Sequence, residues 1–144
     1  VSISQDYHSF SKNLIVQFLR LNKLHPELAR YVKARAPYRT ILNAKAERQT
    51  VASMVSDVDD VSLLISEIEK DGKGIPILLK HYLRLNAKIL SFNVDRKFSN
   101  VVDSLIIVDM TKSDGKLLGR FMSPEGYKKF ARFNGIITDD PGPS

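Results

Sequence analysis

Residues 76–94 constrain the fold most, because they pass from a helical pattern directly into a strand pattern. Pro76 opens a run of strong helix formers that extends to Leu85. Proline is favoured at the start of a helix, where its missing N–H needs no partner. Residues 87–94 then alternate apolar and polar side chains, the pattern of a half-buried strand. We therefore expect an α/β (α+β) fold in which helices pack on a small mixed sheet.

A second strand is predicted at residues 105–108, a continuous aliphatic run that is typical of a strand covered on both faces. Its expected partner is the strand at 87–94. The ten residues between the two strands are long for a tight hairpin and predict a wide loop with a possible functional role.

Five further helices are predicted from apolar spacing and from start signals. Ser123 and Pro124 are favourable residues for the beginning of the last of them. Residues 36–56 show weak periodicity and predict a loop or an extended arm, while residues 1–4 alternate like a strand cut from a larger sheet. The predicted helices are 9–22, a short one from Pro26, one after Asp57 to Ile68, and 117–133 in two pieces.

The length of 144 residues and the 43% hydrophobic content suit one domain with a real core, here placed at 1–137. Residues 138–144 are polar with Pro and Gly, and predict a flexible tail. The chain has no cysteine, which excludes a thiolate nucleophile and Cys-type metal sites. Three scattered histidines predict no metal centre. No apolar run reaches the roughly 20 residues that a membrane-spanning helix needs.

The net charge of +6 is concentrated in the first third of the chain. Between residues 8 and 48 there are nine Lys or Arg residues against Glu27 and Glu47. Such a basic surface can meet acyl carrier protein, anionic lipid or nucleic acid, or can simply be a solvated helix face. Nucleic acid is not an expected partner, because the chain has no recognition-helix, zinc-finger or RNA-binding strand signature.

One segment of the chain resembles a known family. The run from Ile75 to Ala87, followed by a β run that ends at Asp109, is similar to the closing segment of ornithine N-acyltransferases and of the related hemolysin-like branch. The similarity is strong over residues 74–110, and the opening strand with its helix and residues 111–134 also suit that branch. The other matching positions are Asp95, Phe98, Asn100 and Asp103.

The resemblance implies the C-terminal portion of a GNAT-like acyltransferase fold. Such enzymes move a (3-hydroxy)fatty acyl group from acyl carrier protein, or acyl-CoA, to the amine of ornithine during membrane-lipid synthesis. It implies no tightly bound cofactor, and a cytoplasmic protein peripheral to the inner membrane. Family members commonly have Gly where this chain has Asn86, a residue that tolerates left-handed backbone angles.

The half that would hold the acyl donor is expected upstream of Val1, in an upstream acyltransferase domain. The sequence has no Gly-rich turn between a strand and a helix that could cradle the donor phosphates. It also has no acidic residue on an upstream strand that could act as the base. The chain by itself is therefore expected to be inactive.

Tyr82 is the catalytic candidate, because GNAT folds often place a proton-donating tyrosine three residues before a Leu-Gly pair, here Leu85-Asn86. The alternative is a core tyrosine on an apolar helix face. Lys80 and Arg84, one helical turn apart, are candidates for binding a phosphate, or are ordinary surface charges.

Asn93, Asp95 and Asp103 flank the connection between the two predicted strands. The two carboxylates could bind the ammonium group of an amino-acid acceptor. Asp and Asn are also common in turns without any functional reason.

Two other functions are compatible with these residues. The chain could belong to a lysophospholipid O-acyltransferase, although the His-x4-Asp motif of such enzymes is absent. It could also be a non-catalytic basic module that docks acyl carrier protein or an anionic membrane, in which case binding would depend on salt.

Overall fold

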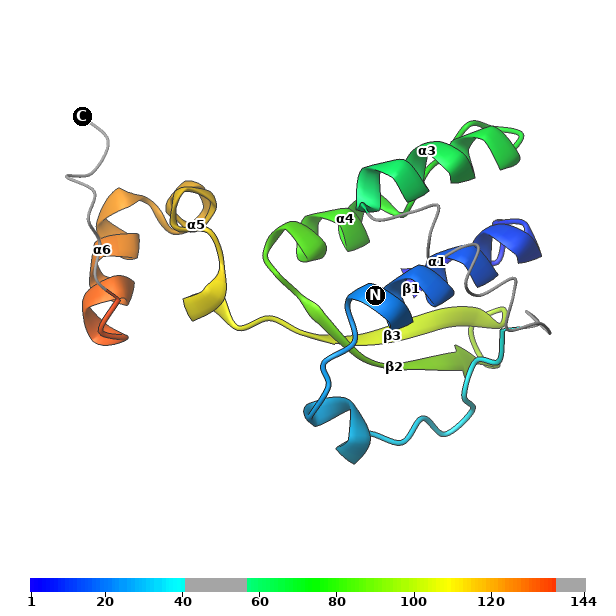
Figure 1. The fold of residues 1–144 in the computed structure, drawn as a ribbon, viewed down its shortest axis with the longest axis horizontal. Coiled ribbons are helices and arrows are strands. Elements are labelled where there is room, and N and C mark those ends of the chain that lie inside the picture. The colour runs from blue at the N-terminus through cyan, green and yellow to red at the C-terminus, as the bar shows by residue number, and fades with distance from the viewer. Residues whose placement is uncertain (41–56, 137–144) are drawn as a thin grey trace.

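The computed structural model describes residues 1–40 and 57–136. Three helices, α1 (Ser9–Asn22), α3 (Val58–Ile68) and α4 (Ile77–Arg84), lie with a three-stranded sheet in the main body (Figure 1). The helices and the sheet share one core, so the predicted α+β class is confirmed.

The sheet contains β1 (Ser2–Ile3), β2 (Lys88–Asp95) and β3 (Val101–Ile107) in the order β1-β3-β2. Both pairs are antiparallel, and Asn93 lies opposite Asp103 across β2 and β3. The sheet is thus antiparallel where the sequence led us to expect a mixed one. A parallel contact exists as an isolated bridge between Leu24 and Ile89.

The connection between β2 and β3 is a short turn, so the predicted wide loop was wrong. Strand β3 begins at Val101 instead of near Leu105. The Asp95 carboxylate accepts hydrogen bonds from the backbone N–H groups of Lys97 (2.9 Å) and Phe98 (3.2 Å), and this closes the turn.

One face of the sheet carries the core. On β3, Val102 and Ser104 are buried, whereas Leu105 is 50% exposed, so the expectation of a strand covered on both faces was wrong. The period of two in a strand places alternate side chains on opposite faces. Residues of α1, α3 and α4 cover the buried face, and each large apolar side chain buried there contributes about 1.5–3 kcal/mol. The core comprises Ile3, Tyr7, Leu14, Ile15, Val16, Phe18, Leu19, Val61, Ile65, Ile75, Leu79, Leu83, Ile89, Phe92 and Val102.

The outer edge of β2 is paired by an extended segment of the region that was predicted to be a loop or an arm. The N–H of Val94 donates to the carbonyl of Ala36 (2.7 Å), and the N–H of Tyr38 donates to the carbonyl of Phe92 (3.3 Å). Residues 41–56 of the same region, and the tail 138–144, lie outside the described residues.

The helix predicted from Pro26 is a single 3-10 turn, η1 (Leu28–Tyr31), with no buried residue to extend it. The predicted start of the last helix is confirmed, because the Ser123 hydroxyl accepts a hydrogen bond from the N–H of Gly126 (3.2 Å). A second 3-10 turn, η2 (Met110–Lys112), follows β3.

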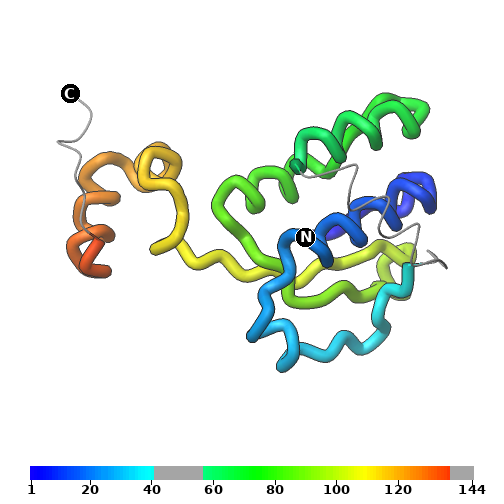
Figure 2. The backbone as a smooth tube through the Cα atoms, in the orientation of Figure 1, coloured from blue at the N-terminus to red at the C-terminus, as the bar shows by residue number. Residues whose placement is uncertain are grey.

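Helices α5 (Gly115–Met122) and α6 (Pro124–Phe133) pack on each other and stand apart from the main body (Figure 2). Their buried residues Leu118 and Ala131 are not members of the core cluster. Across 1–40 and 57–136, no helix is long and apolar enough to cross a membrane.

Candidate functional site

Helix α4 places its three candidate residues on two different flanks. Leu79 and Leu83 point into the core, and Tyr82 is half-buried beside them. Residues two apart in a helix differ by about 200° around its axis, so Lys80 and Tyr82 lie on opposite sides of the buried stripe.

Lys80 contacts an acidic partner on α3. Its Nζ atom lies 2.8 Å from Oδ1 of Asp59. The hydrogen bond from Lys80 is the largest cause that lowers the pKa of Asp59, and the charge of Arg84 lowers it further. The two cations predicted to bind phosphate therefore share a flank with a carboxylate.

Asn93 and Asp103 are brought together as cross-strand partners on the sheet face that points away from the core. The Asp103 carboxylate accepts a hydrogen bond from the hydroxyl of Ser2. The Asn93 Oδ1 atom accepts one from the N–H of Ala36 (2.7 Å). Both side chains thus stabilise neighbouring segments, and Asp95 closes the hairpin as described above.

The sheet separates the predicted site residues into two groups. Tyr82 belongs to a helix on the core side, whereas Asn93 and Asp103 point from the opposite face. The structure therefore does not assemble the six candidates into one site.

A different set of residues lines a hollow of about 660 Å³, which we call the η1 groove. It lies at the end of the sheet where Lys88 pairs with Ile107, beside the residues that lead into η1. Basic, acidic and apolar side chains are all present in its lining. The lining residues are His25, Pro26, Glu27, Leu28, Asn86, Lys88, Ile107, Val108, Asp109 and Lys112.

Asp109 is held in place within the η1 groove. Its Oδ1 accepts hydrogen bonds from the backbone N–H (3.0 Å) and the hydroxyl of Thr111. The hydroxyl hydrogen bond is the largest cause that lowers the pKa of Asp109, and Lys112, 3.8 Å from its Oδ2, adds to this. The groove therefore presents an ionised carboxylate at neutral pH.

The turn after α4 forms part of the η1 groove. Asn86 has a φ of 61°, and its side-chain amide donates a hydrogen bond to the carbonyl of Lys112 (3.4 Å). The hydroxyl of Ser113 donates to the carbonyl of Leu85 (2.7 Å). These contacts join the turn to η2.

The sequence contained only part of the signal for the η1 groove. Asn86 and Asp109 belong to the segment that carries the family resemblance, but His25 and Leu28 lie about 60 residues upstream of that turn. No spacing rule connects residues that distant, so only the fold could bring them together.

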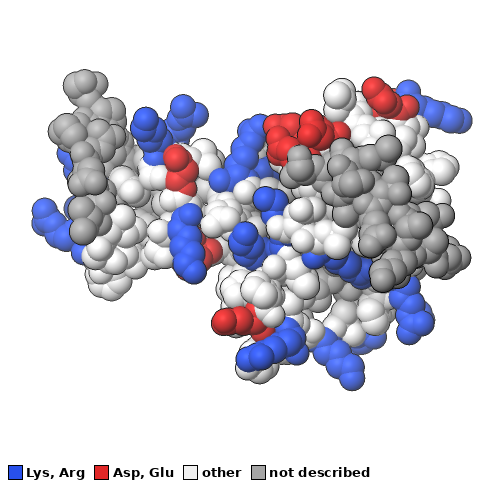
Figure 3. All heavy atoms as spheres, in the orientation of Figure 1, with Lys and Arg blue, Asp and Glu red and all other residues white. Residues whose placement is uncertain are grey.

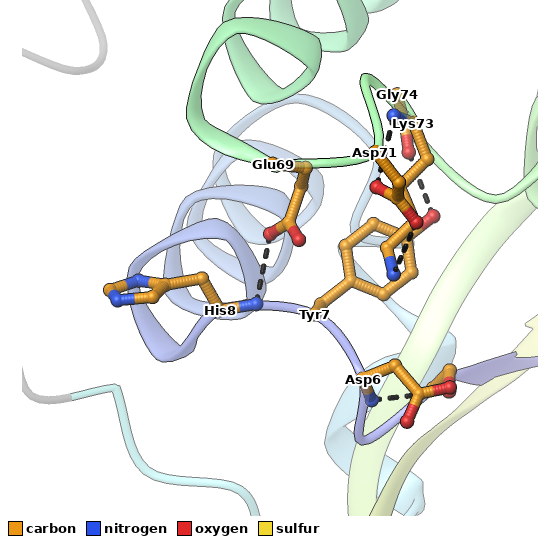
Figure 4. A network of polar contacts seen from close by, with 8 residues as sticks. Asp6, Tyr7, His8, Glu69, Asp71, Lys73 and Gly74 are labelled. Carbon is orange, nitrogen blue, oxygen red and sulfur yellow. Dashed lines mark hydrogen bonds and ion pairs between the residues drawn. The ribbon is translucent and has the colours of Figure 1, made fainter.

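A second hollow, of about 430 Å³, lies where the start of α1 meets the end of α3 (Figure 4). The Tyr7 hydroxyl donates to the carbonyl of Gly74 (2.7 Å), and the His8 N–H donates to Oε1 of Glu69 (2.8 Å). Lys73 pairs with Asp71 at 3.3 Å. Because these groups satisfy one another, we regard the network as structural.

Comparisons with protein-family models, with curated proteins and with solved structures gave no match. Among residues 1–40 and 57–136, no group of three or more His, Asp or Glu residues could hold a metal ion.

Proposed function

We propose that the chain is the acceptor side of a GNAT-like N-acyltransferase. It would help to move a (3-hydroxy)fatty acyl group from acyl carrier protein to the amine of ornithine or a similar amino acid. The observation that carries the proposal is the η1 groove. It combines residues of the family-like segment, Asn86 and Asp109, with charges of both signs.

A zwitterionic amino acid matches this lining. The ammonium groups of ornithine would bind Asp109 and Glu27, and its carboxylate would bind Lys88, through charge-assisted hydrogen bonds. The aliphatic part of the acceptor would lie along Ile107 and Leu28. The proposal thus moves the acceptor site from Asp95 and Asp103, which do not line the η1 groove, to Asp109, which does.

The conformation of Asn86 supports the family resemblance. Its φ of 61° is left-handed, which Gly adopts most readily and Asn better than most other residues. The position where family members commonly carry Gly is therefore one where the backbone favours Gly. The same turn fixes the end of the Tyr82 helix, because the Tyr82 carbonyl accepts hydrogen bonds from the N–H groups of Leu85 (3.1 Å) and Ala87 (3.0 Å).

In this proposal a base of the donor half removes a proton from the α-ammonium group of the acceptor, and the neutral amine then attacks the thioester carbonyl to form the C–N bond. The C–S bond breaks, Tyr82 gives its proton to the departing thiolate, and the new amide nitrogen loses its second proton to restore Tyr82. The donor-binding half would pair with the outer edge of β1. That strand is at one edge of the sheet and pairs only with β3 within the described residues. An unpaired edge can accept another strand.

The test is acyl transfer from 3-hydroxyacyl carrier protein to ornithine, followed by mass spectrometry, for this chain and for any longer product of its gene. We expect product with a form that includes the donor half, and loss of about tenfold or more in kcat/KM for Asp109→Asn and Tyr82→Phe, from one lost charge-assisted contact or proton donor.

Matched controls are Asp114→Asn, a helix-capping aspartate outside the groove, and Tyr31→Phe, which is 73% exposed. Both should retain full activity. If all four variants behave alike, or if no form gives product, the proposal is wrong and a non-catalytic binding module becomes the better account.

A further inference from the structure

The hairpin of α5 and α6 exposes large aromatic side chains. Phe121 is 68% exposed and Phe133 is 90% exposed, although each helix buries one residue against the other. Burial of these two side chains in another apolar phase would be favourable.

The hairpin is rich in cations. Residues 114–136 contain five Lys or Arg against two acids, Asp114 and Glu125. Arg120 and Arg132 directly precede Phe121 and Phe133. Figure 3 shows Lys and Arg side chains over the visible face of this hairpin, with fewer acidic ones. The cations of the hairpin are Lys116, Arg120, Lys128, Lys129 and Arg132.

We propose that the α5–α6 hairpin docks the protein on an anionic lipid bilayer. Phe121 and Phe133 enter the boundary between headgroups and acyl chains, while the neighbouring cations contact anionic headgroups. Long basic side chains can keep their charge among headgroups while an adjacent aromatic is buried. The inference does not rest on the proposed acyl transfer, because it uses residues outside the η1 groove.

The charge pattern favours a lipid surface over a protein groove as the occupant. The two aromatics come from different helices, and each directly follows an arginine, so the hairpin combines apolar and cationic groups. A bilayer surface offers anionic headgroups next to an apolar phase over a wide area. The hairpin is also separate from the main body, so docking leaves the core unchanged.

The absence of tryptophan from the chain allows a direct test. The Phe133→Trp variant has a single tryptophan at a 90% exposed position, and Leu63→Trp is the matched control at a 64% exposed position on the acidic helix α3. With vesicles of phosphatidylethanolamine and phosphatidylglycerol, we expect a blue shift and higher intensity for Phe133→Trp and no change for Leu63→Trp. Vesicles of phosphatidylcholine should change neither spectrum.

Vesicle co-sedimentation then tests the charges. Lys128→Glu with Lys129→Glu should weaken binding at least about tenfold and remove most of its salt dependence. The matched control is Lys33→Glu with Arg35→Glu, two exposed cations of the basic first third. Circular dichroism verifies that each variant is folded.

Three results would overturn the proposal. The first is equal vesicle binding by the wild type and by Lys128→Glu with Lys129→Glu. The second is a larger loss of vesicle binding for Lys33→Glu with Arg35→Glu than for that α6 variant. The third is binding of acyl carrier protein, but not of vesicles, that depends on Lys128 and Lys129.

Discussion

Lys80 of α4 reaches across to α3, where its Nζ atom lies 2.8 Å from Oδ1 of Asp59. The pair joins the flank of one helix to the first turn of the other, and Arg84 lies close enough to influence the same carboxylate. A residue that the sequence suggested as a phosphate ligand thus has a structural partner.

The first prediction concerns acid stability. The pKa of Asp59 is lowered in the folded state, chiefly by its hydrogen bond with Lys80. Its stabilising contribution is therefore present above the ordinary value of 3.8 and is lost as the pH falls below it. Asp59→Asn should cause a small loss of unfolding free energy at neutral pH and none in strong acid, measured by urea unfolding.

The control for this experiment is Asp60→Asn, at the exposed neighbouring position. An equal effect of both substitutions at neutral pH would show that the ion pair contributes nothing specific, as is common for exposed pairs.

The second prediction concerns the turn at Asn86. Because φ is 61°, Asn86→Gly should leave the unfolding free energy nearly unchanged, whereas Asn86→Ala should lower it by about 1 kcal/mol and Asn86→Val by more. Thermal and urea unfolding measure the order of stability of the Gly, Ala and Val variants. Asn134→Ala, at a φ of −93°, is the control for the loss of a side-chain amide. Equal stability of the Ala and Gly variants would contradict the left-handed turn.

The third prediction concerns the segment beside β2. The Tyr38 hydroxyl donates a hydrogen bond to Oδ1 of Asn13 (2.6 Å), and Arg20 donates to the Tyr38 carbonyl (2.6 Å). Tyr38→Phe leaves the buried Asn13 without this donor and should cost about 1–3 kcal/mol of unfolding free energy. Tyr31→Phe, at an exposed position, should cost almost nothing. If Tyr38→Phe leaves the unfolding free energy unchanged, the segment does not pack against the main body in solution.

The fourth prediction concerns alkaline pH. Burial raises the pKa of Tyr7 above its ordinary value of 10.0, and the charges of Glu69 and Asp71 raise it further. The unfolded chain then loses this proton first, so the stability is fully present below about pH 10 and falls as the pH rises beyond it. Tyr7→Phe should flatten this decline, as measured by urea unfolding at increasing pH. An unchanged slope would show that the Tyr7 hydroxyl stays accessible to solvent.

Local patterns predicted β2 and the helices, except the one expected from Pro26. Pro76, the helix formers after it and the alternation in β2 act over a few residues, so the sequence shows them directly. The extent of β3 was missed because Val101, Asp103 and Leu105 alternate with residues whose burial depends on the helices above the sheet. The short turn between β2 and β3 was missed for a related reason. Asp95 closes it through two backbone N–H groups, which no apolar pattern reveals.

The candidate site was less predictable than the fold. Spacing placed Lys80, Tyr82 and Arg84 on one helix, but only the packing of α4 against α3 showed that Lys80 faces Asp59. The η1 groove depends on His25 meeting Lys88 and Asp109 across the end of the sheet. That meeting is a consequence of topology, and a single sequence has no signal for it.

The most direct test of the central claim, acceptor binding in the η1 groove, needs no acyl donor. It is a titration of the isotopically labelled chain with ornithine, followed by the backbone amide signals in NMR. We predict saturable shifts at Asn86, Lys88 and Asp109, absent in Asp109→Asn, with no shift at Glu69 or Lys73 in the other hollow. Shifts confined to Asp95 and Asp103, or no saturable shift at any concentration, would contradict the account.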